Sequence, residues 1–169
     1  MLFRSQLEGN ENGHGSAFLP DDSWVAIVCG MTASGSDDSE ELPSNFFVAP
    51  RDIYMPDLTA IGDVLLGKLG YGTTAECVDA ATPFVFVPRP LFVEEHGLRR
   101  LLEEQGTGVE LTRVMYEEGD WKEAVSRAWE MGREKKNLRR ELGLRVGADG
   151  GRRSEGEEMV QELDRKSVV

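Results

Sequence analysis

The chain has 169 residues, the length of one domain, with 31 acidic and 19 basic side chains and a formal net charge of -12. Nucleic acids and anionic lipid surfaces are bound through basic faces, so this charge argues against both as partners. Hydrophobic residues make up 40% of the chain, enough for one core but not two, and a single domain of this size is small for an enzyme with two sizeable substrates.

The first part of the chain predicts few regular elements. Residues 1–22 are poor in apolar side chains and predict a disordered lead-in. The apolar run at 24–29 predicts a strand that is buried on both faces. Residues 32–41 are rich in Ser and Asp and predict a loop, and a second short strand is expected at 46–48.

Strands and helices are expected to alternate along the rest of the chain. Further strands are expected at 64–66, 84–87 and 109–111, and helices at 56–61, 73–81, 94–105 and 120–142. This alternation predicts an α/β domain with a parallel sheet and flanking helices over residues 23–145. Residues 146–169 lack periodicity and predict a flexible charged tail.

A glycine-rich segment lies between the expected strand at 64–66 and the helix that follows. Gly70 and Gly72 allow a ligand to approach the backbone closely and allow a positive φ. The start of the helix offers unpaired N–H groups and a positive dipole end, which suit a phosphate or diphosphate. The alternative is a tight turn in which Thr73 caps the helix and Glu76 completes a capping box.

A second candidate site follows the expected strand at 84–87. Glu94 and Glu95 stand at a helix start, where their carboxylates can accept hydrogen bonds from sugar hydroxyls. The alternative is that both residues only complement the helix dipole. The neighbouring His96 is expected to be a surface residue rather than a catalytic base.

The cysteines and the hydropathy bear on the cellular compartment. Cys29 and Cys77 lie among apolar residues and predict free, buried thiols, which fits a reducing environment. The cysteines and histidines match no recognised zinc spacing, so no metal or other cofactor is expected. No apolar run approaches 18 residues, so we expect that the chain does not insert into a membrane. We expect a cytoplasmic protein.

Three stretches of the sequence resemble a known family. They are Asp52-x-Tyr54-x-Pro56-Asp57, DVLLGKLGYGTTAEC at 63–77 and PFVFVPR at 83–89. They resemble the glycosyltransferase-like region of plant L-arabinokinases and their relatives, and the similarity runs from about Trp24 to Gly151. That region is similar to the carboxyl-terminal, donor-binding half of GT-B glycosyltransferases, so the resemblance implies a Rossmann-like fold.

The resemblance also implies roles for the candidate residues. A nucleotide sugar, commonly UDP-linked, would have its ribose on Glu76 and its sugar on Glu94 and Glu95, where the family uses an acid and an amide. The base would lie against the backbone of residues 49–51. The diphosphate would lie against a run of five residues: Gly70, Tyr71, Gly72, Thr73 and Thr74.

Two parts of the family are missing from this chain. The amino-terminal half, which supplies the acceptor site and usually the catalytic base, has no counterpart here, and neither has the sugar-kinase portion. We therefore expect no catalytic residue of the chain's own, and glycosyl transfer only with a partner protein that supplies the acceptor domain. Exposed apolar residues at the missing interface are expected at Tyr54, Leu91 and Phe92. The alternative is a non-catalytic nucleotide-binding or regulatory module, or a truncated gene product.

Overall fold

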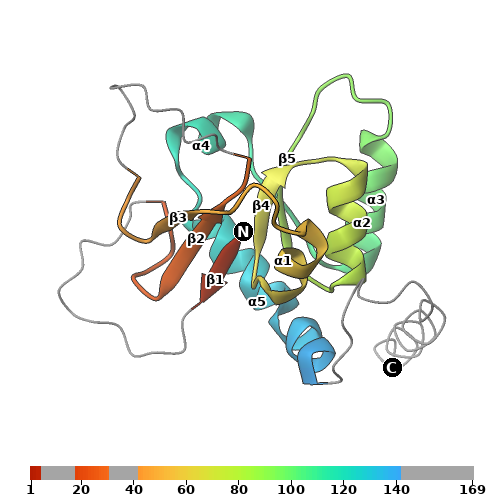
Figure 1. Cartoon of the computed structure of the whole chain (residues 1–169). Helices are drawn as coiled ribbons and strands as arrows, with labels where there is room; N and C mark the ends of the chain where they lie inside the picture. Colours follow the sequence, from red (N-terminus) through yellow and green to blue (C-terminus); the bar gives the residue numbers. More distant parts are fainter. Residues whose placement is uncertain (5–17, 31–41, 142–169) are drawn as a thin grey trace.

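The alternation of strands and helices is reproduced in the computed structural model, which describes residues 1–4, 18–30 and 42–141 (Figure 1). The strands within these ranges are β1 (Leu2–Arg4), β2 (Trp24–Val28), β3 (Phe46–Val48), β4 (Leu65–Lys68), β5 (Phe84–Val87) and β6 (Gly108–Glu110). The helices are α1 (Met55–Ile61), α2 (Tyr71–Asp79), α3 (Glu95–Gln105), α4 (Arg113–Glu118) and α5 (Lys122–Glu141). The α/β fold class is confirmed, while the expected loop at 32–41 and the expected tail lie outside the described residues.

The strands form two three-stranded sheets, in the orders β1-β2-β3 and β4-β5-β6. Strands β2 and β3 are parallel, and so are β4, β5 and β6, but β1 runs antiparallel to β2. An antiparallel bridge joins Leu2 of β1 to Val64, the residue before β4, where the Leu2 N–H donates to the Val64 carbonyl at 2.7 Å. Because β2 and β4 both oppose β1, they run the same way, and all five parallel strands end at one edge of the structure.

Part of the segment expected as a disordered lead-in is ordered instead. Leu2–Arg4 forms β1, and the side chains of Leu2 and Leu19 are buried among apolar residues of the strands and of α5. The disorder expected for residues 1–22 therefore does not hold at these positions, because two buried leucines and the pairing of β1 with β2 fix the chain there. Residues 5–17 lie outside the described residues.

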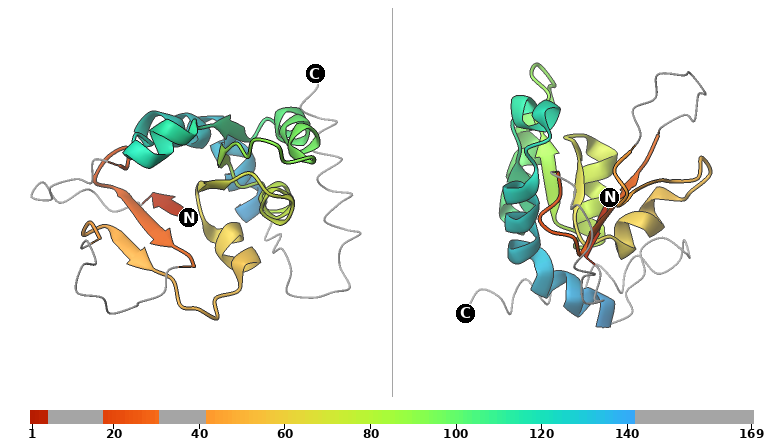
Figure 2. Two further views of the ribbon diagram at one scale, coloured as in Figure 1. Left: turned by 90° about the horizontal axis from the view of Figure 1, so that it is seen from above. Right: turned by 90° about the vertical axis from the view of Figure 1, so that its left-hand side faces the viewer.

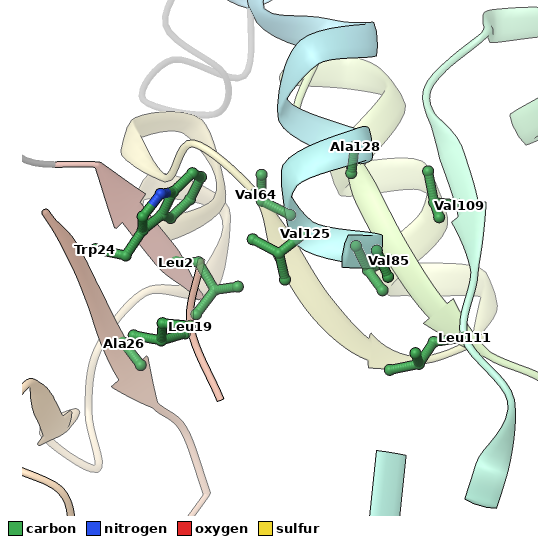
Figure 3. Packing of buried hydrophobic residues seen from close by; sticks show 11 residues of the cluster. Leu2, Leu19, Trp24, Ala26, Val64, Val85, Val109, Leu111, Val125 and Ala128 are labelled. Atoms are coloured by element: carbon green, nitrogen blue, oxygen red, sulfur yellow. The ribbon is translucent and has the colours of Figure 1, made fainter. Parts of the chain in front are cut away.

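Helix α5 covers one face of the strands. Val85 of β5 points to this face and packs with Val125 and Ala128 of α5, which Figure 3 shows against the strands. Trp24 of β2 lies in the same cluster, and its ring contacts that of Trp129 edge-on at a centroid distance of 6.2 Å. The small side chain of Ala128 lets the helix lie close to the sheet.

The opposite face is covered by α2 and α3. Phe84 and Phe86 of β5 alternate with Val85 and point to this second face, where they pack with Cys77 of α2 and Leu102 of α3. Figure 2 shows α5 and the pair α1 and α2 on opposite sides of the strands. A strand with all four residues buried needs cover on both faces, as its continuous apolar sequence predicts.

A buried lysine ties α5 to the far ends of the two helices on the other side. The Lys136 ammonium group donates to the carbonyl oxygens of Thr59 at 3.2 Å and Ala80 at 3.3 Å, and to the Thr82 hydroxyl. Ala80 is the carboxyl-terminal cap of α2, so the cation meets the negative end of that helix. Burial, with help from the nearby Arg140, lowers the pKa of Lys136 to about 7.

Candidate functional site

The candidate site lies at the edge where the parallel strands end. Strand β4 ends at Lys68, opposite Val87 at the end of β5, and the Leu69 N–H donates to the Val87 carbonyl at 2.9 Å. The start of α2 and the loop that leads from β5 into α3 therefore leave the sheet side by side. Ligands of open parallel sheets bind at this kind of edge.

Helix α2 begins with an uncapped turn. Gly70 is its N-cap, with extended backbone angles of φ -152° and ψ 151°, and no side chain caps the helix. The first N–H that closes a helical bond is that of Thr74, which donates to the Gly70 carbonyl at 2.9 Å. The N–H groups of residues 71–73 have no partner within the helix and form its positive end.

This geometry corrects two details of the sequence interpretation. Neither Gly70 nor Gly72 has a positive φ; Gly70 is extended and Gly72 already lies in the first turn of α2. Thr73 is inside the helix rather than its cap, so the capping box of Thr73 and Glu76 does not form. The helix starts earlier than expected because an extended glycine can begin it without a capping side chain.

The space in front of the first turn is open. A Cβ atom added to Gly72 would meet no heavy atom within 4 Å, and one added to Gly70 would meet only the Lys68 carbonyl at 4.0 Å. The neighbouring Tyr71 is 69% exposed, so its side chain is not packed into the core. The two glycines thus allow close approach through their small size and not through a special backbone conformation.

Two polar side chains of α2 lie close behind this turn. Thr74 is fully buried, and its hydroxyl has no hydrogen-bond partner within the described part of the chain. Glu76 is partly buried; burial raises the pKa of its carboxyl group, and the nearby Thr59 hydroxyl partly opposes the rise. The structure therefore places the whole candidate run from Gly70 to Glu76 in the first two turns of one helix.

The two carboxylates at the start of α3 have different surroundings. Glu94 is the N-cap residue of α3, is exposed, and makes no side-chain cap hydrogen bond. Glu95 uses both carboxylate oxygens, one for the Arg89 N–H at 2.9 Å and one for Arg99 Nε at 2.9 Å. Both oxygens of Glu95 already accept hydrogen bonds from the protein, whereas the Glu94 side chain does not cap the helix. The structure therefore favours Glu94 over Glu95 as a contact for a sugar.

A hollow of about 570 Å³ lies where β2 and β3 end. We call it the β2–β3 hollow, and it includes residues 49–51, which the resemblance assigned to a nucleotide base. Its lining residues are Cys29, Gly30, Ala49, Pro50, Arg51, Ile53 and Met55. The sequence interpretation did not include Cys29 and Met55 in this site. Cys29 could have been found, because it directly follows β2 and the ends of parallel strands lie at one edge of a sheet.

The two cysteines differ in exposure. Cys77 is fully buried in α2, as expected, and burial raises the pKa of its thiol. Cys29 is only partly buried and lines the β2–β3 hollow, so the expectation of two buried thiols is wrong for Cys29. Its position one residue beyond the end of β2 leaves it outside the sheet's cover.

Apolar side chains project from the loops at this edge. Leu91 is fully exposed and Tyr54 is 55% exposed, as the sequence predicted. Phe92 is not exposed in the same way, because its ring packs on the α2–α3 side of the core and beneath the Arg89 guanidinium group at 4.4 Å. Val93 is exposed in its place, at 95%.

Among residues 1–4, 18–30 and 42–141, no group of three or more His, Cys, Asp or Glu side chains is arranged to hold a metal ion. Within the same ranges, none of the helices combines the length and the apolar character required to cross a bilayer. His96 is exposed on α3, as the sequence predicted.

The sequence is similar to parts of two curated proteins. The chain is 42% identical to an L-arabinokinase of Arabidopsis thaliana over 105 residues, which cover 62% of this chain and 10% of the relative. It is 32% identical over 99 residues to UDP-N-acetylglucosamine--N-acetylmuramyl-(pentapeptide) pyrophosphoryl-undecaprenol N-acetylglucosamine transferase of Opitutus terrae, covering 54% of this chain and 26% of that enzyme. No family model matches the chain.

A solved structure supports the same fold. The spinosyn forosaminyltransferase SpnP matches 84% of this chain and 34% of its own, with 20% identity and a TM-score of 0.50. Over the matched part, the chain therefore has the fold of one region of a GT-B glycosyltransferase, which is the fold that the sequence resemblance implied. It spans only about a tenth and a quarter of the two curated relatives.

Proposed function

We propose that this chain is the donor-binding half of a glycosyltransferase and binds a nucleotide sugar, with UDP as its nucleotide. The observation that carries the proposal is the uncapped first turn of α2, which follows β4 at the carboxyl edge and has open space over Gly72. The similarity to a transferase whose name specifies a UDP-sugar supports the choice of nucleotide.

In this proposal the diphosphate lies against residues 70–74 at the start of α2, where the N–H groups of residues 71–73 have no partner within the helix. The positive end of a helix and its unpaired N–H groups stabilise a diphosphate both in the ground state and as a leaving group. These local dipoles must outweigh the net charge of -12, which repels an anion from the protein as a whole. We therefore expect modest affinity for UDP.

The rest of the nucleotide sugar would extend along the same edge. Glu76 would accept hydrogen bonds from the ribose hydroxyls, and the backbone of residues 49–51 in the β2–β3 hollow would hold the base. The sugar would meet the start of α3, where the exposed Glu94 carboxylate can accept hydrogen bonds from its hydroxyls. Free thiols at Cys29 and Cys77 fit a reducing compartment, so we place this binding in the cytoplasm.

Transfer would require an acceptor site from elsewhere. We propose that a partner protein, or a further part of a longer protein, docks at the carboxyl edge and supplies it. The exposed Leu91, Val93 and Tyr54 support this docking, because large apolar side chains at a loop edge favour contact with another surface. The protein would then be a glycosyltransferase when assembled with this partner.

A non-catalytic nucleotide-binding or regulatory module is the alternative. It is favoured by the engagement of both Glu95 oxygens with Arg89 and Arg99, which leaves one fewer group for a donor sugar. Such a module would bind UDP but would neither hydrolyse nor transfer a UDP-linked sugar, even with partners present.

Calorimetry with UDP tests the proposal in the wild-type protein and in Gly72→Val. A valine side chain over the first turn should weaken UDP binding at least about tenfold, because it fills the space that the diphosphate needs. The fold should tolerate it, since nothing lies within 4 Å and valine is no worse a helix former than glycine. Glu76→Ala should also weaken UDP binding, through the ribose.

Gly97→Val is the matched control for this experiment. Gly97 lies in the first turn of α3 and also has open space around it, so UDP binding should be unchanged. A wild-type protein that binds no UDP, or a folded Gly72→Val protein with full UDP affinity, would refute the placement of the diphosphate. UDP binding without hydrolysis or transfer of UDP-sugars, with or without added lysate, would favour the alternative.

A further inference from the structure

Glu95 links the loop between β5 and α3 to Arg99 of α3 and, through Arg99, to β6. We call this set of contacts the Glu95 junction. One carboxylate oxygen accepts the Arg89 N–H at 2.9 Å, and the other accepts from Arg99 Nε at 2.9 Å. Arg99 also pairs with Glu110 of β6, and its guanidinium group lies over the Phe86 ring at 5.4 Å. The hydrogen bonds with Glu110 and Glu95 raise the pKa of Arg99.

The loop that this junction holds, residues 88–94, has a conformation that its own sequence does not favour. Leu91 has a φ of +70°, in the left-handed region that a bulky side chain rarely adopts, while its side chain is fully exposed. A bulky residue in this region is strained and persists only where the surroundings fix it. The Phe92 N–H bonds the Arg89 carbonyl and the Glu95 N–H bonds the Phe92 carbonyl, both at 3.0 Å, which sets the turn on either side of Leu91.

Among the residues that the structure describes, the Glu94 carboxylate at the end of this loop has no hydrogen bond or ion pair. Glu94 stands directly before Glu95 as the N-cap residue, yet its side chain is exposed and does not cap α3. The loop begins beside Leu69, whose N–H bonds the last residue of β5, so it leaves the sheet next to the start of α2. A carboxylate with free oxygens at this place can accept hydrogen bonds from the hydroxyls of a bound sugar.

We infer that Glu95 is a positioning residue, which holds the β5–α3 loop in the shape that presents Glu94, and that Glu94 alone of the two meets the donor sugar. This inference rests on the proposed function and differs from the sequence-based hypothesis, in which both carboxylates bind the sugar. This preorganisation matters because ordering a loop on binding costs free energy and so lowers the affinity of the protein for its ligand.

Arg99→Gln tests the inference without altering either glutamate. If Glu95 only positions the loop, removing its partner Arg99 should weaken the binding of UDP-glucose or UDP-N-acetylglucosamine relative to UDP at least about threefold. Glu94→Gln should lower the same ratio at least about fivefold and leave UDP affinity unchanged, because it removes a charged hydrogen-bond acceptor. The matched control is Arg100→Gln, which removes a similar i,i+4 pair with Glu104 at 2.7 Å and should change nothing.

The opposite outcomes are distinct. If Glu95 were itself a sugar ligand, Arg99→Gln would free its carboxylate, and the ratio of UDP-sugar to UDP affinity would stay constant or rise. Glu95→Ala and Arg99→Gln should also be non-additive, since they break the same junction. A Glu94→Gln protein with an unchanged ratio would overturn the assignment of the sugar contact.

Hydrogen exchange gives a readout that needs no ligand. The Arg89 amide is protected by the Glu95 carboxylate, so its exchange should be at least about tenfold faster in Glu95→Ala. It should also be faster in Arg99→Gln and unchanged in Arg100→Gln, all measured in folded protein. If the wild type binds neither UDP nor a UDP-sugar, the proposed function fails, whereas unchanged Arg89 exchange in Glu95→Ala overturns the anchoring itself.

Discussion

Replacing Lys136 by methionine should change how the stability of this protein depends on pH. The Lys136 ammonium group is fully buried, and its contacts are the carbonyls of Thr59 and Ala80 and the hydroxyl of Thr82 rather than a carboxylate. The charged groups around it are Arg139, Arg140 and Asp63, which forms an ion pair with Arg140 at 3.0 Å. Burial and the repulsion from Arg140 lower its pKa from 10.5 to about 7.

Whether stability rises or falls with pH depends on whether the folded or the unfolded chain binds more protons. Between pH 7 and about 10.5 the unfolded chain has Lys136 protonated while the folded chain has it largely neutral, so folding releases a proton. Stability from this group therefore rises with pH across that window, by about 1.4 kcal/mol per pH unit. Between pH 7.5 and 9.0 the gain of the wild type over Lys136→Met should be about 2 kcal/mol.

Urea unfolding of both proteins at several pH values between 7.5 and 9.0 measures this difference. The raised pKa of the Cys77 thiol acts in the opposite direction at higher pH, and Lys136 contributes to that shift, so the comparison is confined to pH 9.0 and below. Lys135→Met, which removes a neighbouring lysine that bonds the Gln105 side chain at 3.0 Å, is the control. A stability difference between wild type and Lys136→Met that stays constant across this range would refute the reasoning.

Three other predictions concern packing, capping and thiol exposure. Gly132→Ala should destabilise the fold by about 1–3 kcal/mol in urea, because its Cβ would lie 2.2 Å from the Pro83 ring; Gly97→Ala, with open space, should not. Thr112→Ala should cost about 1 kcal/mol by loss of the α4 cap to the Met115 N–H, and an unchanged midpoint would contradict this role. A thiol reagent should modify Cys29 before Cys77 in the folded protein, with UDP slowing the reaction; equal rates in mass spectrometry would argue against the β2–β3 hollow as the base site.

The local elements were predictable because their signals are local. The apolar run at 84–87, between two prolines, predicted a strand that is buried on both faces, and β5 has that burial. The glycine-rich segment predicted a strand-to-helix connection with an open helix start, which α2 has. Helix α4 was missed, since six residues without a buried side chain carry little periodicity.

The candidate site was predictable only in part. Thr73 and Glu76 have the spacing of a capping box, but Gly70 begins the helix earlier and places both inside it. The sequence places Phe92 in a loop, where an exposed side chain was expected. Its ring instead packs against the core and beneath the Arg89 guanidinium group. In each case a contact with a residue outside the motif decided the outcome, and a motif contains no information about that residue.

The sequence by itself determined the fold class, the resemblance to a glycosyltransferase region and the presence of an open helix start after the glycine-rich segment, because each depends on residues that are close along the chain. Only the tertiary structure decided that β1 pairs into the sheet, that Lys136 is buried against two helix ends, and that Glu95 forms hydrogen bonds while the Glu94 side chain does not cap α3. The physical reason is that these three depend on burial and on partners distant in sequence, such as Ala80 for Lys136. Identical neighbouring glutamates thus acquire different roles from the groups that the fold places around them.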